Sequence, residues 1–159
     1  MMNNDVLRSI RYMLDISDGK IVDIVKLGGF EVTKADVIAF MKKDKDGEEE
    51  QEEGYLDCSD EVMAHFLDGL VIFKRGKDDS RPPQKIEVPV TNNTVLKKLR
   101  VAFELKEDDM HAILKASEFP VSKPELSALF RKFGHSNYRT CGDQLLRNFL
   151  KGLTLRVRA

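Results

Sequence analysis

The stretch NNDVLRSIR at residues 3–11 returns 89 positions later as NNTVLKKLR at residues 92–100. The same offset relates further identical pairs: Ile24 and Ile113, Lys26 and Lys115, Phe30 and Phe119, Val32 and Val121. Towards the end of each copy the offset shortens to 83, for the pairs Tyr55 and Tyr138, Cys58 and Cys141, Asp60 and Asp143, Phe66 and Phe149, Gly69 and Gly152. Chance does not preserve two registers separated by one gap, so the chain contains two copies of one unit.

Each copy has the apolar spacing of helices. Residues 3–14 place Val6, Leu7 and Ile10 on one face, and an asparagine at the start is a favourable helix cap. A second apolar helix follows, and capping-box patterns at residues 33–36 and 122–125 start a third. The fourth spans about residues 59–74 and 142–155. The sequence predicts an all-α fold of two tandem copies of a roughly four-helix unit.

The domain boundaries follow from the repeat and from the prolines. We expect a first helical repeat at residues 1–75, which is acidic and carries an inserted Glu-rich loop at 44–54. A linker at 76–91 contains three prolines and therefore cannot be helical throughout. The second helical repeat, which is basic, occupies residues 92–159.

The two halves carry opposite charge although the chain has a net charge of −1. Residues 1–80 hold 11 basic and 19 acidic side chains (net −8), and residues 81–159 hold 15 basic and 8 acidic ones (net +7). Such a division allows the halves to attract each other, two chains to pair, or the basic half to bind a polyanion. We expect a protein partner or self-association, with nucleic acid as the other possible partner.

Several classes of protein are not expected. The longest apolar stretches are too short to cross a bilayer, and residues 1–5 lack the pattern of a signal peptide, so we predict a cytoplasmic protein that does not bind membranes. Two cysteines without CxxC spacing predict neither a disulfide framework nor a metal site. The three histidines stand at non-equivalent positions of the repeats. No catalytic constellation, cofactor motif or metal-binding pattern is visible, so we predict no enzyme activity and no cofactor.

The repeated Asn-Asn-x-Val-Leu motif, the stretch KRGKD at residues 74–78 and CGDQLLRNFL at 141–150 together resemble the YehS-like family of small bacterial cytosolic proteins. The resemblance covers nearly the whole chain. It implies a domain of unknown function present in two tandem copies. The family brings no catalytic residues that could be carried over to this sequence.

Repeated side chains provide candidate sites. Arg11 and Arg100 lie at the edge of the apolar stripe in equivalent places. A guanidinium there forms an ion pair within its own copy, the commoner use, or reaches a phosphate or a partner. Cys58 and Cys141 precede the fourth helix, where a thiol is more often buried than nucleophilic.

Gly69 and Gly152 lie inside the predicted fourth helices, where a glycine costs about 1 kcal/mol relative to alanine. Their repetition predicts a close helix approach. We expect that approach between the two fourth helices, across a pseudo-twofold axis.

One nucleic-acid-binding arrangement is also possible. The second and third helices of a copy could form a helix-turn-helix, with residues 33–43 or 122–132 as the recognition helix. In the basic copy the phosphate contacts would come from Lys97, Lys98, Arg100, Arg131 and Lys132. The connection is longer than that motif usually allows, and many helical hairpins only pack.

The first hypothesis is therefore a non-catalytic interaction protein, whose surface is built jointly by both copies or by two chains. The alternative is a helix-turn-helix-like nucleic-acid-binding regulator that uses the basic second repeat.

Overall fold

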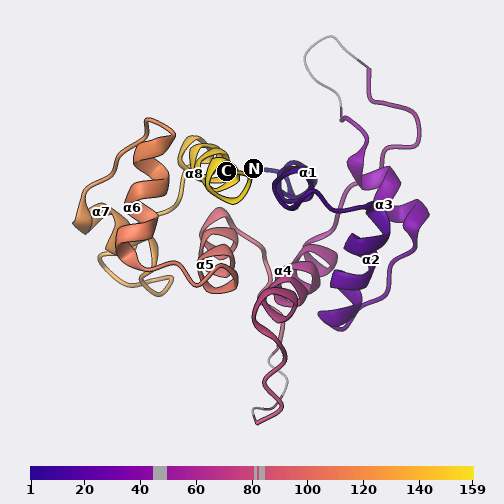
Figure 1. Cartoon of the computed structure of the whole chain (residues 1–159), viewed down its shortest axis with the longest axis horizontal. Coiled ribbons are helices and arrows are strands. Elements are labelled where there is room, and N and C mark those ends of the chain that lie inside the picture. The colour runs from indigo at the N-terminus through magenta and orange to yellow at the C-terminus, as the bar shows by residue number, and fades with distance from the viewer. Residues whose placement is uncertain (45–49, 81, 83–84) are drawn as a thin grey trace.

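The structure is a computed structural model that describes residues 1–44, 50–80, 82 and 85–159. The described residues form eight helices and no strand: α1 (Asn3–Leu14), α2 (Asp18–Leu27), α3 (Lys34–Met41), α4 (Asp60–Arg75), α5 (Asn92–Ala102), α6 (Glu107–Ala116), α7 (Lys123–Leu129) and α8 (Asp143–Val157). The predicted all-α fold with two four-helix copies is confirmed (Figure 1). Within the predicted Glu-rich loop and linker, residues 45–49, 81 and 83–84 lie outside the described residues.

Capping boxes start the third helix of both repeats, as predicted. The side chain of Thr33 accepts a hydrogen bond from the amide of Asp36, whose carboxylate accepts one from the amide of Thr33. Ser122 and Glu125 repeat this exchange at α7. Each box satisfies two amides that have no partner inside the helix.

The repeated asparagines have a different role from the one predicted. Met2 and Thr91 stand at the N-cap positions, so the expected asparagine caps are wrong. The asparagines lie in the first turn, where their side chains face the end of the repeat's third helix and the segment before its fourth. The Nδ2 atom of Asn4 donates to the carbonyls of Phe40 at 3.1 Å and Leu56 at 2.9 Å. Its Oδ1 accepts from the amide of Cys58 at 3.0 Å.

The second repeat has the same set of three asparagine hydrogen bonds, which we call the asparagine bracket. Asn93 Nδ2 donates to the carbonyls of Leu129 at 3.0 Å and Arg139 at 2.9 Å, and Oδ1 accepts from the amide of Cys141 at 2.8 Å. The neighbouring asparagine of each pair, Asn3 or Asn92, donates to the carbonyl of Cys58 or Cys141. The motif therefore fixes the first helix of a repeat to the turn before its fourth.

A close approach of two backbones holds α2 against α4. A Cβ atom added at Gly69 would lie 1.8 Å from the carbonyl oxygen of Ile24, and one added at Gly28 would lie 1.8 Å from that of His65. In the second repeat, a Cβ at Gly152 would lie 2.2 Å from the carbonyl oxygen of Ile113. The predicted close approach therefore exists, but its predicted partner is wrong. It joins the second and fourth helices of one repeat, because only these backbones meet at the glycines.

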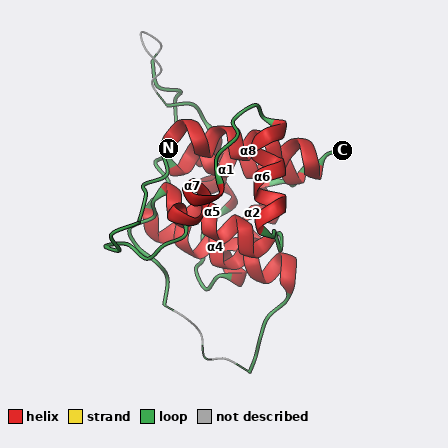
Figure 2. Cartoon of the chain, turned by 90° about the vertical axis from the view of Figure 1, so that its left-hand side faces the viewer, coloured by secondary structure: helices red, strands yellow, loops and turns green. Residues whose placement is uncertain are grey.

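The two repeats share one core. Each first helix packs against the fourth helix of the other repeat, α1 against α8 and α5 against α4. These four helices occupy the middle of the molecule, with α2 and α3 on one side and α6 and α7 on the other (Figure 1), and Figure 2 views the molecule from the side of α6 and α7. Phe66 of α4 and Phe149 of α8, at equivalent positions, are both fully buried. The duplication therefore creates two equivalent helix–helix interfaces between the repeats, α1–α8 and α4–α5, which we call seams.

The chain segments that enter the repeats also cross between them. The amide of Val90, just before α5, donates to Asp60 Oδ2 of the first repeat at 3.1 Å. At the equivalent place, the backbone nitrogen of Met1 forms an ion pair with Asp143 of the second repeat. These two contacts between the repeats stabilise one end of each seam.

Candidate binding groove

Charged side chains close the seam between α4 and α5. The Lys98 Nζ atom lies 2.8 Å from Asp68 Oδ1, with side chains that are only 15% and 22% exposed. Glu87 reaches the same ammonium at 3.9 Å. Farther along the seam, Arg75 and Glu104 form a second ion pair at 3.3 Å. Oppositely charged groups therefore fill this seam.

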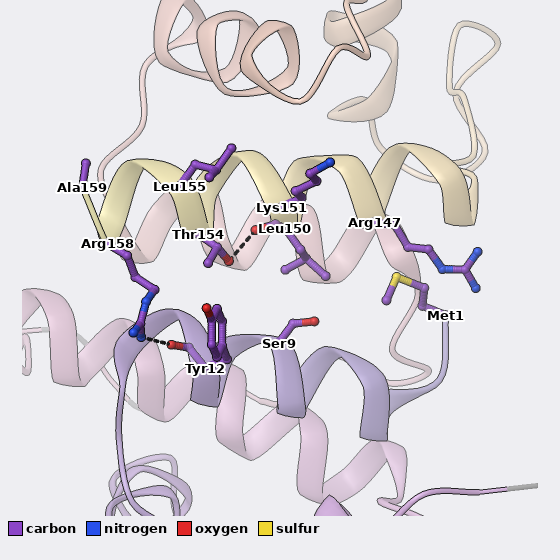
Figure 3. Close-up of a pocket in the computed structure, with 10 residues that line it drawn as sticks. All are labelled: Met1, Ser9, Tyr12, Arg147, Leu150, Lys151, Thr154, Leu155, Arg158 and Ala159. Carbon is purple, nitrogen blue, oxygen red and sulfur yellow. Dashed lines mark hydrogen bonds between the residues drawn. The ribbon is translucent and has the colours of Figure 1, made fainter.

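The equivalent seam between α1 and α8 lacks this pairing. The counterpart of Lys98 is Ser9, and the counterpart of Asp68 is Lys151. A hydroxymethyl group and a lysine cannot form the ion pair of the other seam. A groove of about 600 Å³ lies here, lined by residues of both repeats (Figure 3). That volume is within the range of about 300–1,000 Å³ typical of ligand sites.

The groove runs along α8. Leu150 and Thr154 point from α8 towards α1, and the ring of Tyr12 stands on α1 facing α8 (Figure 3). Lys151 and Leu155 form the rim on the α8 side (Figure 3). Thr154 donates its hydroxyl to the carbonyl of Leu150 at 2.7 Å, so this polar group is satisfied within the helix. The floor is therefore mostly apolar.

Arg158 bridges the groove at the C-terminal end of α8. The Nη1 atom of Arg158 donates to the carbonyl of Tyr12 at 2.7 Å. The same guanidinium lies 4.5 Å from the centre of the Tyr12 ring, within the range of a cation–π contact. This bridge holds the exposed ring in place.

The groove combines positive charge with exposed apolar surface. Arg147, Lys151 and Arg158 contribute three cations. Neither Arg147 nor Lys151 forms an ion pair within 4.0 Å among the described residues, although the charge of Arg147 helps to lower the pKa of Asp143. Tyr12 is 64% exposed and Leu155 is 55% exposed. An occupant that carries both carboxylates and apolar groups would match this lining.

The four predicted candidates on the first helices all have partners within the fold. Arg11 Nε lies 2.9 Å from Asp18 Oδ1. Arg100 Nε donates to the carbonyl of Leu105 at 3.2 Å, and its guanidinium lies 4.6 Å from the centre of the Phe130 ring. Lys97 donates to Glu87 at 3.0 Å, and this hydrogen bond lowers the pKa of that carboxyl. Lys98 closes the α4–α5 seam as described above.

Arg131 and Lys132 are exposed but lie outside any helix. The predicted recognition helices at 122–132 and 33–43 are too long, because α7 ends at Leu129 and α3 ends at Met41. The reason lies in the carbonyls at the end of α7. The carbonyl of Leu129 accepts a hydrogen bond from the side chain of Asn93. The carbonyl of Ala128 accepts one from the amide of Arg139 at 3.1 Å. The acceptors for further helical turns are therefore engaged elsewhere.

Both thiols are buried and free. Burial raises the pKa of Cys58 to about 12 and that of Cys141 to about 11. At neutral pH both are protonated, and a protonated thiol is a poor nucleophile. Within the described ranges, no three His, Cys, Asp or Glu side chains are grouped so that they could hold a metal ion. None of the helices described is long and apolar enough to span a membrane.

No local sequence pattern distinguishes the groove residues. The positions of Ser9 and Lys151 become informative only when each is compared with its counterpart in the other repeat. That comparison shows serine in place of lysine and lysine in place of aspartate, and its meaning depends on knowing which helices pack together.

Known proteins provide a family for the chain. The family model described as "Protein of unknown function (DUF1456)" matches residues 3–76 and 92–159. The chain is 47% identical over 156 residues to "Uncharacterized protein YehS" of Escherichia coli (strain K12), covering 98% of this chain and 96% of that protein. No solved structure matches the chain.

Proposed function

The chain belongs to the DUF1456 family of proteins of unknown function, and we propose from its geometry that it is a non-catalytic binding protein. Its binding surface is the groove between α1 and α8, to which both repeats contribute. The observation that carries the proposal is the contrast between the two seams. The same fold closes one seam with the Lys98–Asp68 ion pair and leaves the other open with Ser9 and Lys151 in those places.

The partner that fits is an acidic amphipathic helix of another protein. The α8 side of the groove is lined at positions 147, 150, 151, 154, 155 and 158, which is the i, i+3, i+4, i+7 spacing of one helix face. This face extends for about 16 Å at 1.5 Å per residue. A helix laid along it would place leucines against Tyr12 and Leu155, and glutamates beside Lys151 and Arg147.

The charge of the second repeat supports the same partner. Residues 81–159 carry a net charge of +7, and the cations that line the groove belong to that half. Electrostatic complementarity would accelerate the encounter with an acidic segment and exclude basic ones. The interaction should therefore weaken as the salt concentration rises.

The proposal is tested by titrating the ¹⁵N-labelled protein with two designed helical peptides. Both carry leucine at the i, i+3, i+4 positions, one with glutamate and one with lysine on the remaining face. We expect the glutamate peptide to shift the amide resonances of Tyr12, Lys151 and Thr154, and the lysine peptide to leave them unchanged. Equal shifts with both peptides, or shifts confined to residues outside the groove, would contradict the proposal.

A pair of charge reversals provides the matched comparison. Lys151→Glu should abolish the shifts, because it places a carboxylate on the rim. Lys115→Glu, on the exposed face of α6, changes the net charge equally and should preserve them. Loss of binding in both variants would show that only the overall charge matters.

The helix-turn-helix regulator has less support. A recognition helix normally reads the major groove with several turns, whereas α7 has seven residues and is followed by an irregular segment. Arg131 and Lys132 remain exposed and available to phosphates, but they do not lie on that helix. Tight, salt-sensitive binding to duplex DNA that is lost in Arg131→Ala/Lys132→Ala would favour this second function.

A further inference from the structure

Phe133 is the most exposed large apolar side chain in the part of the chain that the structure describes. Its side chain is 85% exposed, compared with 64% for Tyr12, the next most exposed. It lies in the segment 130–142 that connects α7 to α8. A single exposed apolar side chain is ordinary on a protein surface, so the exposure of Phe133 is informative only together with its neighbours.

Several hydrogen bonds hold the segment around Phe133 in one conformation. The amide of His135 donates to the carbonyl of Lys132 at 3.0 Å, and the amide of Tyr138 donates to that of His135 at 2.9 Å. The amide of Asn137 donates to His135 Nδ1 at 3.0 Å. Arg139 forms an ion pair with Glu125 of α7 at 2.6 Å. The Phe133 ring therefore projects from a loop whose conformation is fixed by these hydrogen bonds and this ion pair.

A second aromatic ring supports the first. The rings of Phe133 and Tyr138 meet edge to face, with centroids 5.5 Å apart and an interplanar angle of 77°. Arg131 and Lys132 precede Phe133 directly and are both exposed. A supported aromatic ring beside two cations is the combination that binds single-stranded nucleic acid, by stacking on bases and by contact with phosphates.

The first repeat has no such feature. Lys43 and Tyr55 correspond to Lys132 and Tyr138, but between them the first repeat carries the acidic insertion and no phenylalanine. The fold unit therefore forms without an exposed ring at this place. Folding of the unit does not require Phe133.

We propose that the loop at residues 130–139 binds single-stranded nucleic acid, with a base stacked on Phe133 and the backbone phosphates beside Arg131 and Lys132. This site is separate from the α1–α8 groove, since α7 lies at one end of the molecule and α1 near its middle (Figure 1). Stacking tolerates any base, so the site discriminates single strands from duplexes more strongly than one sequence from another.

The chain contains no tryptophan, which allows a direct test of stacking. In Phe133→Trp, the introduced indole is the only one in the protein. Oligo(dT) should quench its fluorescence, and heparin, a polyanion without bases, should not. Quenching by neither, or by both equally, would overturn the proposal.

Affinity measurements separate stacking from charge. By fluorescence anisotropy with labelled oligo(dT), Phe133→Leu should bind about 5- to 150-fold more weakly than the wild type, the range expected for one lost stacking contact. Arg131→Ala/Lys132→Ala should weaken binding and reduce its salt dependence. The matched double variant Lys115→Ala/Lys123→Ala removes two exposed cations of the same repeat and should have a smaller effect. Unchanged affinity in Phe133→Leu, or no binding by the wild type at low salt, would overturn the proposal.

Discussion

Asp68 and Lys98 form an ion pair at 2.8 Å across the seam between α4 and α5, and their counterparts across the α1–α8 seam are Lys151 and Ser9. Because the chain is duplicated, each seam is a control for the other. The closed seam shows that these helices can pack with charges paired between them. The groove at the other seam is therefore a property of its side chains and not a requirement of the fold.

The ion pair should contribute measurably to stability. Asp68→Asn leaves the largely covered ammonium of Lys98 without its near carboxylate, and we expect a loss of about 1–2 kcal/mol in the free energy of unfolding, between the values for surface and buried pairs. Urea denaturation provides the measurement. As a comparison, Lys97→Ala breaks the exposed pair with Glu87 and should cost less than about 0.5 kcal/mol. Equal losses in the two variants would contradict the role assigned to Asp68.

The glycine crossing should be intolerant of a single methyl group. In Gly69→Ala the new Cβ would lie 1.8 Å from the Ile24 carbonyl oxygen, so α2 and α4 would have to separate. We expect a loss of at least about 3 kcal/mol, the upper range for overpacking.

Gly19→Ala, on α2 but away from the crossing, is the control for this substitution. Its Cβ would meet its nearest neighbour, Ser17 Oγ, at 3.8 Å, so this variant should be neutral or stabilised by up to about 1 kcal/mol. Thermal unfolding of both variants decides the matter. A Gly69→Ala protein as stable as Gly19→Ala would disprove the close contact.

The two asparagine brackets should differ in their contribution. Asn4 is 2% exposed, and removing its side chain leaves three main-chain groups without partners in a covered site. We expect Asn4→Ala to cost at least about 3 kcal/mol, from the lower limit of about 1 kcal/mol for each of the three unsatisfied groups. Asn93→Ala removes the same three bonds where water can replace them, and should cost about 1–2 kcal/mol. A larger loss for Asn93→Ala in chemical denaturation would contradict this ordering.

Alkaline pH should unfold the protein through its thiols. Burial raises the pKa of Cys58 from 9.0 to about 12, so between these values the thiol ionises in the unfolded chain but not in the folded one. The stability that the buried, neutral Cys58 thiol contributes is therefore fully present below pH 9 and is lost as the pH rises. The slope of this loss approaches about 1.4 kcal/mol per pH unit for one group.

Cys58→Ala tests this pH dependence. The variant should show a flatter decline just above pH 9, whatever its stability at neutral pH. Tyr55, whose pKa is raised by burial and by its hydrogen bond to Asp57, contributes only above its ordinary pKa of 10. An unchanged slope between pH 9 and 10 would mean that the thiol ionises as readily in the folded state as in the unfolded one.

Much of the fold is predictable because the duplication repeats its local signals. Capping boxes and apolar stripes depend only on neighbours in the chain, so the helices were found within a few residues. The partners of Gly69 were not predictable in the same way, since a glycine indicates a close approach but does not say which helix approaches. The role of Asn4 was missed for a similar reason, because its three partners are 36 to 54 residues away.

The groove was beyond sequence reasoning for a physical reason. Ser9 and Lys151 line the same groove only because each first helix packs against the fourth helix of the other repeat. Nothing local in the sequence distinguishes that arrangement from packing within one repeat. Once the seams are known, comparison of Lys151 with Asp68 identifies the open one.

The most direct test of the groove is to close it with the charges of the other seam. The double variant Ser9→Lys/Lys151→Asp gives the α1–α8 seam the ion pair of α4–α5, and its stability in urea should equal or exceed that of the wild type. Its affinity for the acidic amphipathic peptide, measured by fluorescence anisotropy with a labelled peptide, is the decisive quantity. We expect a folded protein that no longer binds the peptide. A folded double variant that binds it as tightly as the wild type would contradict the assignment of the groove as the binding site.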